Sequence, residues 1–150
     1  MRALNLGVPE EHRPFLRIGT CSWKYDSWQG LIYREGVRYG PFDYLPEYAG
    51  YFTTVEVDQW FWSLFPTDVK LPEEETVRHY AESVPDDFLF SVKVPNAITL
   101  THFCGKQSRR YREYANRPNE HFLSPELFER FLSTLVPMGS TLGPLMFQFA

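Results

Sequence analysis

Cysteine is scarce in this chain of 150 residues, which contains only Cys21 and Cys104, far apart in the sequence. That separation excludes the closely spaced cysteine pairs of structural zinc sites, and we interpret both side chains as reduced thiols. The sequence also lacks the run of about 20 apolar residues that a membrane span needs. Residues 1–14 lack the apolar centre of a signal peptide. We therefore expect a cytoplasmic protein without membrane contacts.

Several functional motifs are missing as well. The sequence contains no Walker motif, GxGxxG, GxSxG or CxxC, so nucleotide-binding, acyl-transfer and dithiol chemistry receive no support. It contains no HxH or HExxH either, and we predict no metal and no cofactor. A net charge of −4 argues against a generally basic nucleic-acid binder.

Short apolar segments alternate with helical patterns along the chain. The predicted strands cover 15–23, 53–61, 88–95 and 145–149. Between them, apolar residues repeat with helical spacing over 44–52, from Pro72 to Val84, and over 127–135, where Ser124 and Pro125 form an N-terminal capping signal. This alternation predicts an α/β fold with parallel strands.

The two faces of each predicted strand differ. Val55 and Val57 share an apolar face, whereas Glu56 and Asp58 share the other. A doubly wound sheet would be apolar on both faces, but the inner face of a barrel tolerates polar residues near its mouth. We therefore predict the N-terminal half of a parallel (β/α)8 TIM-type barrel, with about four strands and three helices. It is truncated, because a closed barrel needs about 250 residues. Residues 1–14 are expected to form an extension and 15–150 the partial barrel domain.

Four segments together resemble the YecE-like family, also called domain of unknown function 72. They are Ile18–Trp23 with the later Trp28 and Gly30, Thr54–Asp58, Phe90–Pro95 with Ile98-Thr99, and Leu142–Leu145 running into Phe147-Gln148. The resemblance implies a TIM-type barrel of uncharacterised activity. The chain departs from it at Asp58–Trp62, where the mouth is more aromatic, and at His102, which is displaced from the family's Ile-Thr-His pattern.

Polar residues from different predicted strands should converge on the inner face of the barrel. We name Glu56, Lys93, Asp58 and Gln148 as candidate catalytic residues, with Cys21 beside them. Glu56 would act as a general acid or base, Lys93 as an anchor for an anionic group, and Gln148 as an orienting amide. The alternative is a Glu56–Lys93 ion pair that merely fills the lumen. A metal held by Glu56, Asp58 and His102 is less favoured, because no ligand spacing supports it.

Two further groups are candidate ligand-binding residues. Trp23, Trp28 and Trp60 are candidate ligand-binding residues at or after the ends of the first two strands. Together with Trp62, Tyr25 and Tyr33 they form either a stacking platform or a hydrophobic plug in the loops. Arg109 and Arg110 belong to a basic, tyrosine-containing loop over 106–117 that either binds nucleic acid or is a solvated surface.

The functional hypotheses follow from these groups. The first is an uncharacterised barrel enzyme that acts on a small anionic or phosphorylated ligand at the C-terminal mouth of the strands. The second is a protein that binds or processes nucleic acid with the loop over 106–117. The third is a non-catalytic module completed by a partner or a second copy, because half a barrel exposes two sheet edges and should self-associate.

Overall fold

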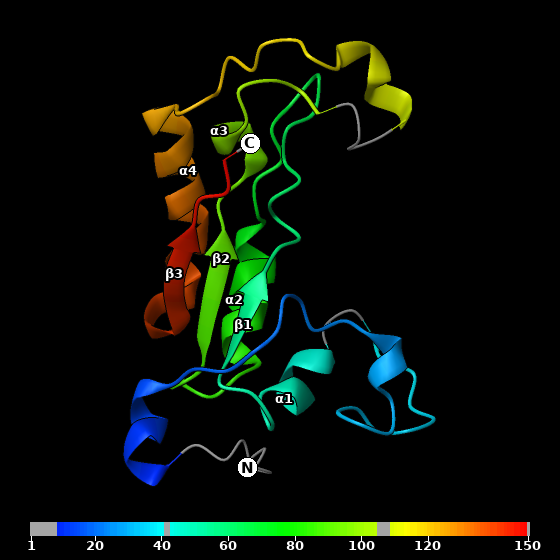
Figure 1. Ribbon diagram of the computed structural model, residues 1–150, viewed down its shortest axis with the longest axis vertical. Helices are drawn as coiled ribbons and strands as arrows, with labels where there is room; N and C mark the ends of the chain where they lie inside the picture. Colours follow the sequence, from blue (N-terminus) through cyan, green and yellow to red (C-terminus); the bar gives the residue numbers. More distant parts are fainter. Residues whose placement is uncertain (1–8, 41–42, 105–108, 150) are drawn as a thin grey trace.

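The computed structural model describes residues 9–40, 43–104 and 109–149 and has an α/β fold (Figure 1). The α-helices are α1 (Tyr44–Tyr48), α2 (Glu74–Glu82), α3 (Asn96–Thr99) and α4 (Pro125–Leu135). The strands are β1 (Thr54–Val57), β2 (Leu89–Lys93) and β3 (Leu142–Met146). Short 3-10 helices cover Glu10–Phe15 (η1), Asp26–Trp28 (η2), Arg109–Tyr114 (η3) and Val136–Thr141 (η4). Nowhere in the described part of the chain is a helix long and apolar enough to cross a membrane.

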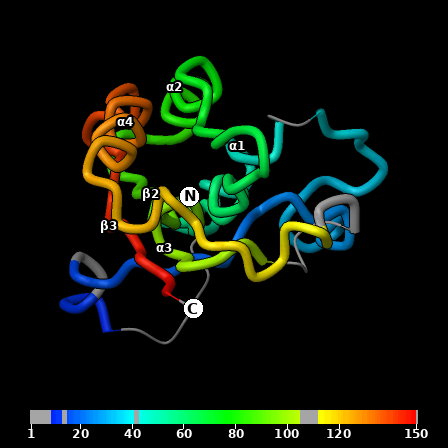
Figure 2. Tube along the Cα trace, turned by 90° about the horizontal axis from the view of Figure 1, so that it is seen from above, coloured from blue at the N-terminus to red at the C-terminus, as the bar shows by residue number. Residues whose placement is uncertain are grey.

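The sheet is parallel, with the strand order β1-β2-β3. Figure 2 shows α4, α2 and α1 in an arc along one side of the strands. The strand residues Val55, Val57, Phe90 and Val92 are at most 1% exposed and belong to the same hydrophobic core as residues of these helices. Burial alternates along β1 and β2, so the other face of the sheet carries their partly exposed residues. The predicted difference between the two faces is therefore confirmed.

The helices lie where their patterns predict them. Ser124 caps α4, since its Oγ accepts a hydrogen bond of 3.1 Å from the Leu127 backbone N–H, and Pro125 occupies the first turn. In α2 the acidic residues Glu74 and Glu75 occupy the first turn, as expected for the positive end of a helix dipole. The helix predicted over 44–52 is shorter, because α1 ends at Tyr48 and the chain turns at Gly50.

The first predicted strand, 15–23, is wrong as a regular strand. The segment does run beside β1, but only Cys21 forms a bridge, with Glu56. The reason is the buried Tyr48, whose hydroxyl accepts a hydrogen bond from the Thr20 N–H (2.9 Å) and lies 3.1 Å from the Thr54 carbonyl, to which it can donate. A side chain thus occupies a place where two strands would pair directly. A Cβ atom on Gly19 would lie 1.9 Å from the Thr54 carbonyl oxygen, so this close approach requires glycine.

The fourth predicted strand, 145–149, begins too late. Strand β3 starts at Leu142 and includes Gly143 and Pro144, which in sequence are typical of a loop. Pairing with β2 is irregular at this point, and such an irregularity accommodates a proline that has no N–H to donate. Beyond the strand, the Phe147 ring packs against Phe128 of α4, with centroids 5.4 Å apart.

Candidate functional site

Glu56 and Lys93 project from the open face of the sheet, near the carboxyl ends of β1 and β2. The register pairs Glu56 with Ser91, and Lys93 lies two residues beyond Ser91, so all three share one face. The neighbouring Val57 and Val92 point the other way, into the core. Strand alternation therefore fixes the position of this pair independently of the loops.

The two side chains form an ion pair with a thiol beside it. Lys93 Nζ lies 3.1 Å from Glu56 Oε1, and the side chains are only 18% and 19% exposed. The Cys21 thiol donates a hydrogen bond of 3.4 Å to the same oxygen. Lys93 Nζ also lies over the ring of Phe61, 5.5 Å from its centroid. The predicted convergence of Cys21, Glu56 and Lys93 is thus observed.

The environment of Cys21 keeps its thiol protonated. Partial burial raises the pKa of this thiol, and the hydrogen bond to Glu56 and the negative charges of Glu56 and Asp58 raise it further. Lys93 opposes these effects but does not outweigh them. Because the thiolate is the nucleophilic form of cysteine, Cys21 serves here as a hydrogen-bond donor to Glu56.

The other two candidate catalytic residues lie apart from the ion pair. Asp58 follows the end of β1 and is half-buried. Its negative charge contributes to the raised pKa of the Cys21 thiol. Gln148 lies beyond β3, is exposed, and lines a separate hollow of about 260 Å³ together with Phe61 and Trp62. Phe61 contacts both places, so it links the ion pair to this hollow.

The tryptophans differ in their accessibility. Trp23 is 1% exposed and packs edge-on against Tyr80 of α2, so the hydrophobic-plug alternative describes its position. Trp60 is partly exposed and its ring stacks on the ring of Tyr80, with centroids 5.7 Å apart. Trp28 packs against Tyr25 and Tyr33. Trp62, the remaining tryptophan of the predicted aromatic group, is 49% exposed.

The basic loop contributes less to the described site. Lys106 and the side chains of Arg109 and Arg110 lie outside the described residues. Arg117 holds its guanidinium over the ring of Tyr114, 4.5 Å from the centroid. Nucleic-acid binding by this loop stays a prediction.

His102 is exposed and forms a backbone bridge with Pro118 rather than joining Glu56 and Asp58. In the described part of the chain, no three histidine, cysteine or acidic side chains gather as a metal site would require.

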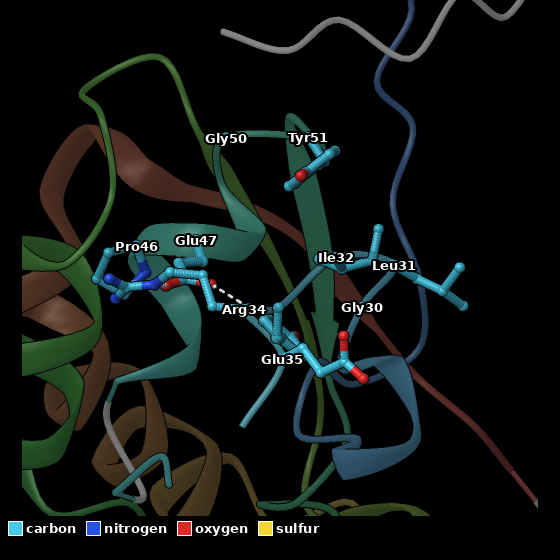
Figure 3. A pocket seen from close by; sticks show the side chains of 10 residues that line it. Gly30, Leu31, Ile32, Arg34, Glu35, Pro46, Glu47, Gly50 and Tyr51 are labelled. Atoms are coloured by element: carbon cyan, nitrogen blue, oxygen red, sulfur yellow. Dashed lines mark hydrogen bonds and ion pairs between the residues drawn. The ribbon is translucent and has the colours of Figure 1, made fainter. Parts of the chain in front are cut away.

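A larger hollow, of about 450 Å³, lies between the segment 30–35 and the segment 46–51 (Figure 3). Two of its charged residues, Arg34 and Glu47, form an ion pair. Glu47 binds the Arg34 side chain at 2.5 Å and also accepts a hydrogen bond from Tyr39, which together lower the pKa of its carboxyl group despite some burial. This hollow lies away from the ion pair of β1 and β2, and we do not assign it to the site.

Sequence reasoning missed the buried amide that positions the loop after β1. Asn96, at the start of α3, is fully buried. Its Oδ1 accepts hydrogen bonds from the backbone N–H groups of Ser63 (2.9 Å) and Leu64 (2.8 Å), and its own N–H donates to the Phe61 carbonyl (2.7 Å). The available signal was the Pro95-Asn96 pair directly after a strand, since asparagine side chains often bond to nearby backbone.

Comparison with known proteins shows the family of this chain. Residues 17–150 match the family described as Protein of unknown function DUF72. The chain belongs to the DUF72 family. The predicted resemblance to YecE-like proteins is thereby confirmed. A comparison with curated proteins found no match.

Two crystal structures of a DUF72 family protein from Enterococcus faecalis are similar to this chain. They show 23% identity with a TM-score of 0.56 and 22% identity with a TM-score of 0.50. Each comparison covers 89% of this chain and 39% of the other, so this DUF72 chain spans well under half the length of its solved relative. At such identities the likeness shows a shared fold.

Proposed function

We propose that this chain supplies the N-terminal half of a (β/α)8 barrel. The parallel order β1-β2-β3 and the arc of α4, α2 and α1 outside the strands support this architecture (Figure 2). The first segment, bridged to β1 at Cys21, would be the opening strand of the barrel. The open face of the sheet would then line the lumen of the barrel, with Glu56 and Lys93 near its mouth. We retain the cytoplasm as the expected location.

Within that barrel, we propose that Glu56 and Lys93 form the reaction centre of an enzyme for a small anionic or phosphorylated substrate. The observation that carries the proposal is the Lys93–Glu56 contact of 3.1 Å on neighbouring parallel strands. Barrel enzymes place their working groups at this end of the strands. An ammonium group shielded from bulk water attracts an anionic group more strongly than an exposed one does.

The two oxygens of Glu56 have different surroundings. Oε1 receives both Lys93 and Cys21, whereas no hydrogen bond or ion pair to Oε2 is found among the described residues. Oε2 is therefore the atom that would take a proton from a bound substrate or return one to it. An anion that binds Lys93 would compete with Oε1, and the Cys21 thiol would then remain as the donor that holds Glu56 in place.

Titration calorimetry with inorganic phosphate tests the centre. We expect Lys93→Met to abolish phosphate binding and Glu56→Gln to strengthen it, because a competing carboxylate charge is removed. Glu56→Gln should also abolish any turnover while the protein still folds. Lys70→Met is a matched control, since Lys70 also lies over an aromatic ring but is exposed and takes no part in the Glu56–Lys93 ion pair. If Lys93→Met leaves the phosphate affinity unchanged, or if Glu56→Gln prevents folding, the pair only fills the lumen.

A module completed by a second chain is the alternative that a further observation favours. Three apolar residues in or just after β3 are strongly exposed, namely Met146 (38%), Phe147 (43%) and Phe149 (58%). Exposed apolar side chains beside an unpaired strand edge promote association. Sedimentation velocity should then show dimers or larger species that dissociate in the variant Phe147→Ser/Phe149→Ser. A wild-type protein that remains a monomer at high concentration would contradict this alternative.

A further inference from the structure

The hollow beside the ion pair is lined by both apolar and polar residues. Phe61, Trp62 and Leu100 are apolar, whereas Thr101, His102 and Gln148 bring hydroxyl, imidazole and amide groups, and Cys104 completes the lining. These residues follow the ends of β1, β2 and β3, so three separate loops build the hollow at the same end of the sheet. Its volume of about 260 Å³ suits a ligand smaller than the drug-sized molecules that fill pockets of roughly 300–1,000 Å³.

Trp62 presents a partly exposed indole to this hollow. Its ring packs edge-on against Phe61, with centroids 5.0 Å apart and an angle of 78° between the planes. Phe61 is 7% exposed, whereas Trp62 is 49% exposed. The backbone on both sides of Trp62 is held by Asn96, which bonds to the Phe61 carbonyl and to the Ser63 N–H. An exposed indole held in this way can stack on a ligand at little entropic cost.

The charges in and beside the hollow favour an anionic ligand over a cationic one. None of the residues that line the hollow is acidic. Lys93 does not line the hollow itself, but its ammonium lies over Phe61, 5.5 Å from the ring centroid, where it pairs with Glu56. A cation would find no carboxylate among the described lining residues, whereas an anion that extends past Phe61 could compete with Glu56 for Lys93. A flat ring against Trp62 and an acidic group toward Lys93 would use both features at once.

We propose that this hollow binds the ring of a small aromatic or heteroaromatic anion, with the ring on Trp62 and the carboxylate or phosphate on Lys93. The proposal deepens the proposed function and rests on it for the anionic end. It assigns Trp62 to ring binding and leaves proton transfer to Glu56. His102, Thr101 and Gln148 are then positioned to bond to polar substituents of the ring.

Calorimetry with a graded set of ligands tests the proposal on the whole protein. Phenyl phosphate, cyclohexyl phosphate and methyl phosphate share one charged group and differ in the ring, and benzoate and acetate repeat the comparison with a carboxylate. We expect phenyl phosphate to bind about tenfold more tightly than methyl phosphate, with cyclohexyl phosphate between them. Trp62→Ala should remove this advantage, whereas Trp62→Phe should keep most of it. Phe15→Ala is the control, because Phe15 is exposed and lies outside the hollow.

The outcomes distinguish a failure of the ring site at Trp62 from a failure of the anion centre at Lys93. Equal affinities for phenyl, cyclohexyl and methyl phosphate that all depend on Lys93 would overturn the ring site and leave the proposed function standing. An advantage of phenyl phosphate that survives Trp62→Ala would likewise overturn it. Loss of binding in Trp62→Ala with no effect of Lys93→Met would overturn the anion centre instead. Absence of binding for every ligand would overturn both, and a larger gain for benzoate than for phenyl phosphate would identify a carboxylate as the natural group.

Discussion

Lys93 Nζ lies 3.1 Å from Glu56 Oε1, across two neighbouring parallel strands. The backbone register fixes this relationship, because Glu56 pairs with Ser91 and Lys93 follows on the same face. Both side chains are less than one-fifth exposed, so the pair is better shielded from water than a surface ion pair. Loss of either partner would leave the other charge partly buried and unpaired.

The pair should therefore show measurable coupling in stability. In a double-mutant cycle with Glu56→Gln and Lys93→Met, we expect a coupling energy of about 1–2 kcal/mol from chemical denaturation. A cycle with Arg34→Met and Glu47→Gln should give a smaller value, because the Arg34 side chain is 75% exposed. A coupling no larger than that of the Arg34 pair would mean that water screens the Glu56–Lys93 contact as well.

Cys21 should react slowly with iodoacetamide at neutral pH. Burial and the neighbouring Glu56 raise the pKa of its thiol above the ordinary value, so the reaction midpoint should lie at a higher pH than that of an unstructured cysteine. Measured in a Cys104→Ser background, Glu56→Gln should move the midpoint down, because a hydrogen bond and a negative charge that oppose the thiolate are removed. A midpoint unchanged by Glu56→Gln would show that Glu56 does not control this thiol.

The same raised pKa has a consequence for stability at alkaline pH. As the pH rises into the alkaline range, the thiol of the unfolded chain loses its proton first, so stability should fall from the unfolded pKa through the folded pKa. Comparison of Cys21→Ser with the unchanged protein isolates this contribution. The stability difference between the two should be constant at neutral pH and should change only in the alkaline range.

Tyr48→Phe should destabilise the junction between the first segment and β1. The substitution removes the hydroxyl that bonds to the Thr20 N–H at 2.9 Å and lies against the Thr54 carbonyl. Two backbone groups would lose a partner, and we expect a loss of about 1–3 kcal/mol in the free energy of unfolding. Tyr51→Phe is the control, because the Tyr51 hydroxyl has no hydrogen bond to any described residue. Equal effects of the two substitutions would contradict the structural role of Tyr48.

Ser124→Ala should weaken α4 at its start. The Ser124 hydroxyl accepts the Leu127 N–H, and loss of a serine N-cap costs about 1 kcal/mol. Ser133→Ala in the same helix is a matched control, since its hydroxyl only donates to the Glu129 carbonyl within the helix. Thermal unfolding should show a lower midpoint for the first variant and little change for the second.

The helices and the sheet face could be predicted because their signals are local. The capping residues of α4 and the alternation Val55-Glu56-Val57 each depend on neighbours only a few positions away. The first strand could not be predicted correctly, because its disruption comes from the Tyr48 hydroxyl, 28 residues from Thr20. Strand β3 was misplaced because Gly143-Pro144 signals a loop unless an irregular pairing with β2 is known.

For the site, the sequence predicted which residues of β1 and β2 meet, but not which loop residues join them. Strand alternation suffices to place Glu56 and Lys93 together. Gln148 lies beyond the last strand, where alternation no longer determines position, and it lines the neighbouring hollow instead. Trp23 and Trp62 look alike in sequence, yet one is 1% and the other 49% exposed, because loop packing decides their burial.

The buried residue Asn96 has a consequence for which substitutions this site can accept. It bonds to the backbone of Phe61 and Ser63, on either side of Trp62, and these bonds do not involve the indole. The residue at position 62 can therefore be exchanged without disturbing the frame that holds it. With Asn96 in place, the side chain at position 62 can vary without loss of the backbone bonds at Phe61 and Ser63, so a change in the exposed ring need not change the fold.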